Sequence, residues 1–554
     1  MRSPDGQPEP AAGGAPGTVR GVIARNTAFN AAGRAWEAVT GLLLTIYILE
    51  RIDFAAWGLW SLVAVFTGYV SLLDFGIGSG FAKYIAEHAA RNERDRLSAV
   101  VSTGFFFYLA LGPALVVAGW PCIDWCIAGV VRLMTWLAPE RAGDFRDLAL
   151  LSDVRFLFRW GLVLFAVSNC ASAFTAVQTG LQRMGVTNVI SFAASLIKIA
   201  STVLFLELGF GVRGLLYSSA LVTGAFALAS MAAAFRLAPD LRVSPRRIER
   251  ATFRALFSFG WRAQIAKLAN LVMYQTDKVI VGLVYAQFGP IGVYRFGEEL
   301  ANKVRQGPLM LLSALIPAAS DLDARDDHDR LRRLYLTSSK YVAAVAVPAL
   351  AFAAASAGLL VHACLGDKDG VPVAAWVLRF IAVGNIANVI SGAGVSVALG
   401  RGRADLHMKA GLIAAGANVV LTVALYLAIG FYGIPLATML AMFITWGWFL
   451  AAMKQTVPVH VAEFFRTVLL WPALAAAPGI VICAAVDAFG PQGAGRLPNA
   501  ALAMAAAAGF GVLYLAIMRC APFLDGFDVD FLGDTLRLRR LPGFRFLTGR
   551  AQRV

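Results

Sequence analysis

Charged and amide side chains occur inside segments that are otherwise apolar, and they recur there at helical spacing. The earliest such segment carries Asn26, Asn30, Arg34 and Glu37. At about 100° per residue these four side chains fall within an arc of about 80° on one helical face. The segment therefore predicts a helix with one narrow polar stripe, which offers charge and hydrogen bonds to a polar ligand.

Two later segments carry richer stripes. In residues 256–285 an arc of about 100° holds Lys267, Asn270, Tyr274, Asp277 and Lys278, with Arg262 beside it. In residues 290–318 one face holds Arg295, Glu298, Glu299, Asn302, Lys303 and Gln306, with Arg305 at its edge. Single charges inside other apolar segments are Arg159, Lys198 and Arg379. Three helices that each gather their charges on one face favour a shared aqueous cavity.

The balance of charge in these stripes indicates the class of ligand. Basic residues outnumber the acidic ones, and apolar walls strengthen the resulting field. A cationic cavity selects an anion, and Arg or Lys suits phosphate. The predicted substrate-binding residues are Arg34, Glu37, Arg262, Lys267, Lys278, Arg295 and Lys303. Candidates for coupling to a proton or Na⁺ are Asp277, Glu298 and Glu299, and secondary cavity candidates are Asn30, Arg159, Lys198, Asn270, Tyr274, Asn302 and Arg379.

A structural interpretation of the same charges stays open. Arg159, Arg305 and Arg379 lie where a long side chain can extend to lipid headgroups. Arg295 with Glu299, and Glu299 with Lys303, are i,i+4 pairs that neutralise each other. The acidic residues also sit among cations, so neutralising neighbours is an alternative to coupling.

The composition of the chain indicates which elements carry the stripes. Of 554 residues, 58% are hydrophobic and 15% are charged, and the mean hydropathy is +0.67. One soluble core does not accommodate so apolar a chain of this length. A span needs about 20 apolar residues, and this window predicts an all-α polytopic membrane protein with about fourteen spans. They lie near 27–49, 54–73, 97–119, 155–180, 187–207, 212–236, 256–285, 290–318, 337–360, 373–399, 407–429, 433–453, 464–486 and 498–518.

The basic residues that give the net charge of +15 lie mainly in the predicted loops and tails. With the N-terminus inside, most Lys and Arg fall in the tails and even-numbered loops, as in the cluster from Arg242 to Arg254. Cytoplasmic loops are enriched in Lys and Arg, so we expect both termini in the cytoplasm. The surplus charge is then explained by topology and anionic lipid, and no nucleic-acid partner is predicted.

A short pattern repeats in the two halves of the chain. Phe54-Ala-Ala-Trp57-Gly58-Leu-Trp60 and Phe288-Gly-Pro-Ile291-Gly292-Val-Tyr294 share Phe, an apolar residue, Gly and an aromatic residue at equal spacing. Each copy opens a span, and each of these spans ends in a charged segment. An even number of spans in each repeat places the halves in parallel orientation, so two six-helix lobes face each other.

The opening residues resemble a known family. The segment from RNTAFNAAGRAWEAV to LLDFGIGSGFAKYIAEHAARNERDRL, and FSFGWRAQIAKLANLVMYQTDKVIVG in the second half, are similar to polysaccharide transporters. The resemblance is to the O-antigen and exopolysaccharide repeat-unit flippases (Wzx-type) of the MOP exporter superfamily. It implies a V-shaped pair of six-helix bundles with two added C-terminal helices, and an undecaprenyl-diphosphate-linked oligosaccharide as cargo in the inner membrane. It also implies membrane lipids, a polysaccharide polymerase and chain-length machinery as partners.

The corresponding organisation has six parts. They are a cytoplasmic arm (1–20), an N-lobe (21–237), a cytoplasmic linker (238–255), a C-lobe (256–455), two additional spans (456–519) and a basic cytoplasmic tail (520–554).

Other functions remain as alternatives. A lipid II flippase or a multidrug exporter of the same superfamily has the same architecture. An integral-membrane glycan polymerase, ligase or glycosyltransferase is the enzyme alternative, but we find no Walker loop, HExxH motif or nucleophile elbow. The His residues lack metal-ligand spacing, and the i,i+4 spacing of Cys122 and Cys126 suits a disulfide poorly. We therefore predict a transporter without enzymatic activity, cofactor or metal.

Overall fold

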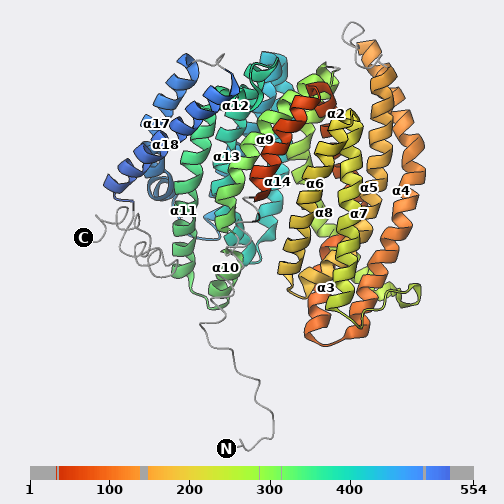
Figure 1. Cartoon of the computed structure of the whole chain (residues 1–554). Coiled ribbons are helices and arrows are strands. Elements are labelled where there is room, and N and C mark those ends of the chain that lie inside the picture. Colours follow the sequence, from red (N-terminus) through yellow and green to blue (C-terminus); the bar gives the residue numbers. More distant parts are fainter. Residues whose placement is uncertain are drawn as a thin grey trace, which may run out of the picture.

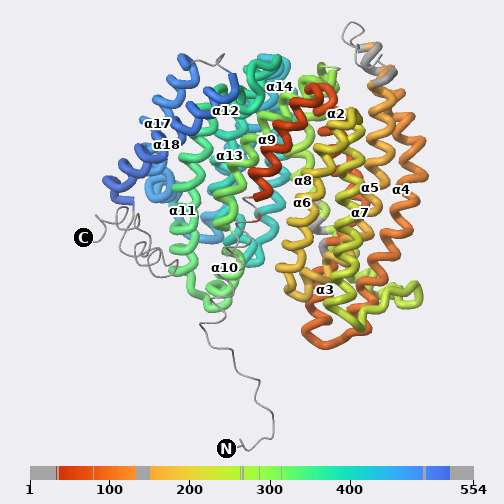
Figure 2. Tube along the Cα trace, in the orientation of Figure 1, coloured from red at the N-terminus to blue at the C-terminus, as the bar shows by residue number. Residues whose placement is uncertain are grey.

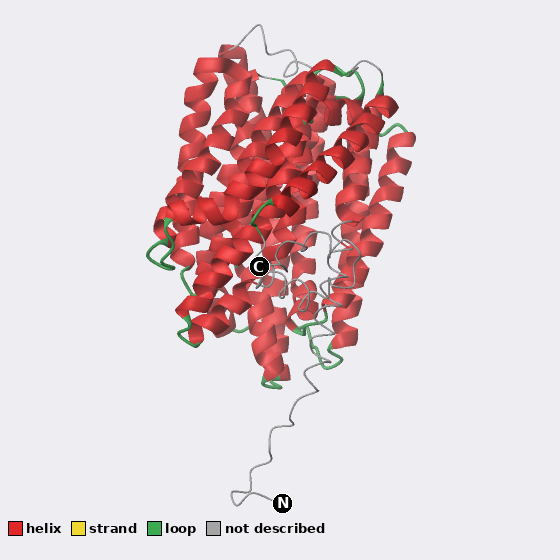
Figure 3. Cartoon of the chain, turned by 90° about the vertical axis from the view of Figure 1, so that its left-hand side faces the viewer, coloured by secondary structure: helices red, strands yellow, loops and turns green. Residues whose placement is uncertain are grey.

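The computed structural model describes residues 33, 36–137, 148–285, 287–312, 315–490 and 495–523. Helices and turns make up this part of the chain, and it contains no strand (Figure 3). The all-α prediction is therefore confirmed for the described residues. The chain's first helix covers residues 36–51.

The remaining helices follow the predicted spans closely. In the first half they are α2 (Phe54–Val70), α3 (Ile77–Ala90), α4 (Arg94–Leu137), α5 (Leu148–Gly180), α6 (Met184–Glu207) and α7 (Gly211–Leu237). The next are α8 (Arg250–Tyr285), α9 (Gly289–Leu309), α10 (Leu315–Ala324), α11 (His328–Ala355), α12 (Ala357–Leu365) and α13 (Val371–Gly400). The last are α14 (Ala404–Ile429), α15 (Gly433–Met453), α16 (Val461–Phe464), α17 (Leu470–Phe489) and α18 (Arg496–Cys520).

Ten stretches of the described residues are long and apolar enough to cross a membrane. One of them, Ala404–Met453, contains both α14 and α15. Helices α8 and α9 are long but carry the charged stripes, and the predicted first span begins in residues outside the described part. The chain is thus a multi-pass membrane protein, while a count of fourteen spans stays a prediction.

The helices form two groups that approach each other at one end (Figure 1). One group contains α3, α4, α5, α6 and α7, and the other contains α9 to α15 with α17 and α18 on its outer side. The groups diverge towards the end where α3 and α10 lie. The first helix, red in Figure 2, runs between α6 and α9, and so lies between the two groups.

The repeated sequence pattern forms the contact at the converging end. A Cβ atom on Gly58 would lie 2.0 Å from the carbonyl oxygen of Phe288, and one on Gly292 would lie 2.1 Å from that of Phe54. The two glycines therefore let α2 and α9 approach backbone to backbone, each against the other copy of the repeat. This reciprocal contact agrees with the internal repeat in the sequence.

The start of α2 is fixed by a local signal. Asp53 caps this helix, and its carboxylate accepts a hydrogen bond from the backbone N–H of Ala56 at 2.8 Å. Such a cap satisfies one of the unpaired N–H groups in the first turn. The helix therefore begins at Phe54, which puts Gly58 one turn inside it and opposite α9.

Helix α8 joins the two groups. Its first half packs on α3, where Gly76 and Gly260 meet so closely that a Cβ on either would lie about 2 Å from the other's carbonyl oxygen. Its second half packs on α14 and α9. Gly76 also has φ of 75°, a left-handed conformation that glycine adopts readily, so Gly76 forms the turn into α3 and the rest of the GIGSG segment begins that helix.

Candidate functional site

Two residues of the polar stripe of α9, Glu299 and Lys303, contact the first helix. The hydroxyl of Thr45 donates a hydrogen bond to Oε1 of Glu299 at 3.2 Å. The Lys303 side chain lies against Gly41, because its Nζ is 2.6 Å from where a Cβ on that glycine would be. Arg295 lies 3.7 Å from Glu299 across one helical turn. Thr45 and Gly41 of the first helix thus meet Glu299 and Lys303 of α9, and we call this contact the front seam (the first helix against α9).

The first helix also contacts α6 on its other side. The indole N–H of Trp36 donates to the hydroxyl of Ser195 at 3.0 Å, and its ring packs 5.3 Å from that of Phe192. Lys198 is exposed one turn beyond Ser195. Glu37 is exposed as well, so acidic and basic side chains both border this part of the helix.

The lower half of α8 contacts the end of α2. The ammonium of Lys267 donates to the backbone carbonyl of Ser71 at 3.1 Å, and Gln264 donates to that of Leu72 at 2.9 Å. Asn270 is exposed on the same helix. A second seam thus lies between α2 and α8, and we call it the back seam.

Two of the predicted charges are already paired inside the protein. Nζ of Lys278 lies 2.8 Å from Oε2 of Glu298, and the lysine side chain is 1% exposed. This ammonium also donates to the carbonyl of Tyr274 at 2.7 Å. A buried pair of this kind holds α8 against α9, because either charge alone would be costly to bury.

Asp277 occupies a separate buried site beside this pair. Its Oδ2 accepts hydrogen bonds from Tyr294 and Thr438, both at 2.6 Å. Asn418 donates to the hydroxyl of Thr438 at 3.0 Å, so α8, α9, α14 and α15 meet at this carboxylate. The site opens on a cavity of about 10 Å³, which suits one small particle such as a water molecule or a bare cation.

Several oxygens at this site have no hydrogen-bond partner within the described residues. They are Oδ1 of Asp277 and Oδ1 of Asn418, and one turn beyond Asn418 on α14 the Oγ1 of Thr422 also has no partner among the described residues. Leaving a buried polar atom unsatisfied costs about 1–3 kcal/mol. Carboxylate, amide and hydroxyl oxygens are ligands that hard cations prefer. The chemistry of this set therefore fits a small cation better than an anion.

A third polar group links α8, α9 and α13. Arg305 donates to the hydroxyl of Tyr274 and to Oδ1 of Asn388, each at 3.1 Å. Asn388 in turn donates to the Tyr274 hydroxyl at 3.1 Å. Asn302 lines the cavity next to Asp277. Arg305 thus points into the C-lobe, instead of extending to lipid headgroups.

Other predicted residues lie away from these seams. Arg159 pairs with Asp124 and packs on Trp120 in the α4–α5 pair, and Arg379 pairs with Asp487 of α17. Arg34 and Asn30 lie outside the described residues, as does the side chain of Arg262.

The Asp277 site includes residues that the charge pattern did not indicate. Asn418, Thr422 and Thr438 are uncharged and stand in strongly apolar segments. The i,i+4 spacing of Asn418 and Thr422 is the one sequence signal that places both on a single face of α14.

The chain matches two family models over parts of its length. The model described as "Polysaccharide biosynthesis protein" matches residues 156–369, and the model described as "Lipid II flippase MurJ" matches residues 308–494. No curated protein sequence matches the chain. One description names polysaccharide biosynthesis and the other a lipid II flippase, in accordance with the resemblance noted in the sequence.

Solved structures share the whole architecture at low sequence identity. The lipid II flippase MurJ in an inward closed conformation has a TM-score of 0.62 and 13% identity, over 88% of this chain and 98% of its own. A MATE-family multidrug resistance transporter, inward-facing, has a TM-score of 0.57 and 16% identity, over 77% and 99%. A MOP-superfamily transporter from Pyrococcus furiosus has a TM-score of 0.56 and 14% identity, over 80% and 97%. These likenesses confirm the expected fold.

Proposed function

We propose that this chain, which has the fold of MOP-superfamily transporters, is a flippase for undecaprenyl-diphosphate-linked oligosaccharide repeat units. It would move them across the bacterial inner membrane for synthesis of a surface polysaccharide. The match to a polysaccharide biosynthesis model supports this cargo. The observation that carries the proposal is the front seam, where the charged stripe of α9 meets the first helix between the two lobes.

A diphosphate-sugar head needs such a seam. Burying an isolated charge in hydrocarbon costs tens of kcal/mol in the Born limit, so the head has to travel through a polar interior. Lys267 and Arg295 lie on α8 and α9, the two helices that border the lobes. We expect them to bind the diphosphate through charge-assisted hydrogen bonds, with Arg34, Glu37, Arg262 and Lys303 completing the site. Lys278 can bind the diphosphate only after its ion pair with Glu298 breaks.

Transport then requires the lobes to separate at the end that is closed in this structure. That end is sealed by the Gly58–Gly292 contact and, below it, by the hydrogen bond between Thr45 and Glu299. Rocking of one lobe on the other would break both contacts and expose the head to the opposite side. The seal also buries apolar side chains of both halves, among them Trp57 and Leu59 of α2 and Ile291 and Phe296 of α9, so opening it exposes apolar surface.

The Asp277 site supplies a means of coupling. A proton or Na⁺ bound at the unsatisfied oxygen of Asp277, close to Thr438 and Asn418, would join α8 to α14 and α15. Since α9 also contacts Asp277 through Tyr294, occupancy of this site would change how α8 and α9 pack. Differential affinity of the ion for the two lobe arrangements is what shifts their populations.

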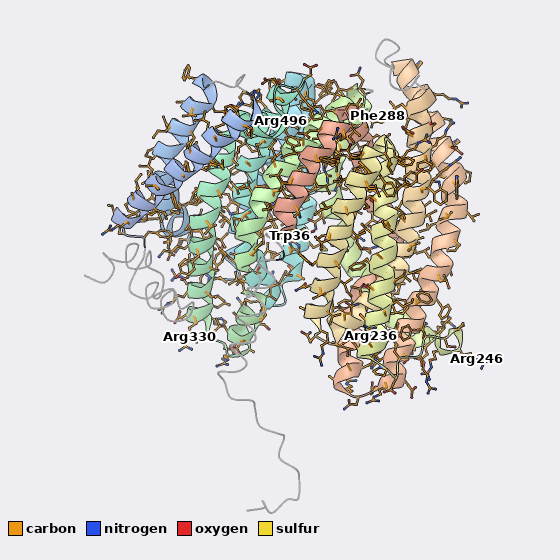
Figure 4. The ribbon with its side chains drawn as sticks, in the orientation of Figure 1. Trp36, Arg236, Arg246, Phe288, Arg330 and Arg496 are labelled. Carbon is orange, nitrogen blue, oxygen red and sulfur yellow. The ribbon has the colours of Figure 1, made fainter. Side chains whose placement is uncertain are left out.

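The orientation in the membrane follows from the placement of Arg residues. Arg236, Arg246 and Arg330 lie at the end where the lobes diverge, and Phe288 lies at the converging end (Figure 4). The excess of Lys and Arg in cytoplasmic loops puts the diverging end in the cytoplasm. Both termini are then cytoplasmic, and the structure faces inward.

Lipid II is the second candidate cargo. The match of residues 308–494 to the MurJ model and the likeness to a MurJ structure favour it. Both cargoes are polyprenyl diphosphates, so the seam chemistry suits either one.

The two candidates are separated by reconstitution. Proteoliposomes containing the chain receive either a fluorescent polyprenyl-diphosphate oligosaccharide or fluorescent lipid II, and a membrane-impermeant quencher reports which leaflet holds the label. We expect the oligosaccharide to equilibrate faster than lipid II. Faster movement of lipid II would reverse the assignment, and no movement of either above protein-free vesicles would refute the flippase function.

A further inference from the structure

A large apolar groove lies beside the back seam. It has a volume of about 600 Å³ and is formed by α2, α4, α5 and α8. Among its walls are Phe66 of α2, Leu73 of the 3-10 turn that follows α2, Ala118 and Ile123 of α4, Phe158 of α5 and Leu283 of α8. Its polar groups are the hydroxyl of Tyr69 and the thiols of Cys122 and Cys126. The groove is thus a hydrocarbon surface with a polar group at its border.

Both lobes contribute to this groove. Helices α2, α4 and α5 belong to the first half of the chain, whereas α8 and the lining residue Phe288 belong to the second. From Leu62 to Leu73 the α2 wall is about 16 Å long at 1.5 Å per residue. This is about half of a hydrocarbon core about 30 Å thick, so the groove holds a long chain and not a compact ligand.

The surroundings of the groove define its occupant. The helices that build it are membrane spans, with α8 as the charged exception, so the chains available to fill it are those of lipids. The hydroxyl of Tyr69 lies 3.3 Å from that of Thr276, which joins the α2 wall of the groove to α8. At the lower end, Lys267 binds the carbonyl of Ser71, two residues from Leu73. A lipid chain in the groove would therefore have a positive charge close to its head.

The front seam is joined by polar contacts among the described residues. There the first helix is held to α9 by Thr45 and Glu299, and its outer end is bound by C-lobe residues. Lys368 donates to the carbonyl of Leu49, and Arg496 pairs with Glu50. The two seams thus differ in chemistry, since one is joined by polar contacts and the other is bordered by an apolar groove.

We propose that the groove at the back seam binds the polyprenyl tail of the cargo while the diphosphate lies near Lys267. This inference rests on the proposed function and specifies where the cargo enters. The tail stays in the groove, in contact with membrane hydrocarbon, while the head occupies the polar space between the lobes. Because α8 is one wall of the groove, movement of the lobes changes the shape of the tail site together with that of the head site.

Photo-crosslinking tests the occupant directly. The photoreactive residue p-benzoylphenylalanine replaces Ala118, which lines the groove, or Val117, which is 74% exposed and does not line it. The protein is reconstituted in phosphatidylethanolamine and phosphatidylglycerol with radiolabelled polyprenyl phosphate. We expect labelling at position 118 to exceed that at position 117 at least five-fold, and excess unlabelled polyprenyl phosphate to abolish it. Equal labelling at the two positions, or a phospholipid adduct at 118 that polyprenyl phosphate does not displace, would overturn the inference.

The functional test is to fill the groove with a larger side chain and measure the flipping rate. Ala118→Trp places an indole in the groove, and Val117→Trp adds the same side chain to the adjacent lipid-facing position. We expect Ala118→Trp to lower the flipping rate about ten-fold relative to Val117→Trp at equal amounts of folded protein. If Ala118→Trp flips as fast as its control while the unmodified protein is active, the tail site is wrong and the flippase function stands. If the unmodified protein moves no polyprenyl-diphosphate cargo, the proposed function itself fails.

Discussion

The contact between Gly58 and Gly292 allows a quantitative test of lobe movement. A Cβ on Gly58 would lie 2.0 Å from the carbonyl oxygen of Phe288 and 2.9 Å from the backbone nitrogen of Gly292. Ordinary contact begins near 3.4 Å, so Gly58→Ala requires α2 and α9 to separate by about 1.4 Å. The clash is with backbone atoms, which cannot move away through a change of rotamer as a side chain can.

The energetic effect follows from this clash. Overpacking a close contact costs about 1–3 kcal/mol, and here the cost applies only to the state in which the seal is formed. A differential cost of that size shifts a two-state equilibrium about 5- to 150-fold. Gly58→Ala should therefore increase the population with an open outer end by that factor. Gly292→Ala should do the same, because its Cβ would lie 2.1 Å from the carbonyl oxygen of Phe54.

Cysteine accessibility measures this population. Thr45→Cys introduces a reporter at a position that is 5% exposed below the seal, and a membrane-impermeant maleimide is added from outside. We expect the labelling rate to rise at least five-fold in the Gly58→Ala background. The matched control is Gly224→Ala on α7, where an added Cβ has no atom within 4 Å among the described residues. Labelling of the Gly58→Ala protein at the rate of this control would refute the role of the glycine contact as a seal.

Three further predictions concern the charges of α8 and α9. Glu298→Gln, which leaves the buried Lys278 unpaired, should destabilise the protein by about 3–5 kcal/mol, and Lys278→Met combined with Glu298→Met should restore thermal stability in detergent. Asp277→Asn should remove the dependence of transport on a proton or Na⁺ gradient while binding of the lipid-linked cargo persists, as measured by flipping under imposed gradients. Lys267→Gln and Arg295→Gln should each reduce flipping about ten-fold with normal membrane insertion, since each removes a charge-assisted hydrogen bond of about 1.5–3 kcal/mol.

Exposed charges provide the controls for these predictions. Asp321 and Arg325 form a solvent-exposed i,i+4 pair on α10 and the turn after it. Asp321→Asn and Arg325→Gln change the same kinds of side chain at a surface where ion pairs contribute about 0–1 kcal/mol. Loss of transport in these controls equal to that at Lys267 would show that net charge, and not the site, is responsible. Unchanged ion dependence in Asp277→Asn would exclude this carboxylate from coupling.

The sequence predicted the helices well because hydropathy and helical period are local properties. Most predicted spans within the described residues coincide with one helix, whereas 290–318 is divided between α9 and α10 and 337–360 between α11 and α12. The charges of α9 do not all face one neighbour, since Glu299 contacts the first helix and Glu298 contacts α8. The Phe54–Trp60 and Phe288–Tyr294 repeat predicted paired lobes, and the structure brings its two glycines together.

The partners of individual charges were less predictable. Helical periodicity predicts which face of α8 carries Lys278 and which face of α9 carries Glu298. It does not predict how the two helices are rotated relative to each other, and this rotation brings the two side chains into contact. Asn418, Thr422 and Thr438 were not predicted because they are uncharged and stand in spans that have no stripe of charged residues. Their common site with Asp277 exists only where α14 and α15 pack against α8. Similarly, the groove residues have the composition of any lipid-facing surface, and only the separation of α4 from α8 makes them a groove.

Crosslinking across the front seam tests the central claim, that the chain flips lipid-linked oligosaccharide by movement of its lobes. Cysteines at positions 45 and 299 replace two side chains that form a hydrogen bond in this structure. The doubly substituted protein is reconstituted with fluorescent polyprenyl-diphosphate oligosaccharide, and leaflet occupancy is measured before oxidation, after oxidation and after reduction. We predict flipping in the reduced protein, its loss on disulfide formation and its recovery with reductant. Flipping at an unchanged rate in the fully crosslinked protein would contradict the mechanism.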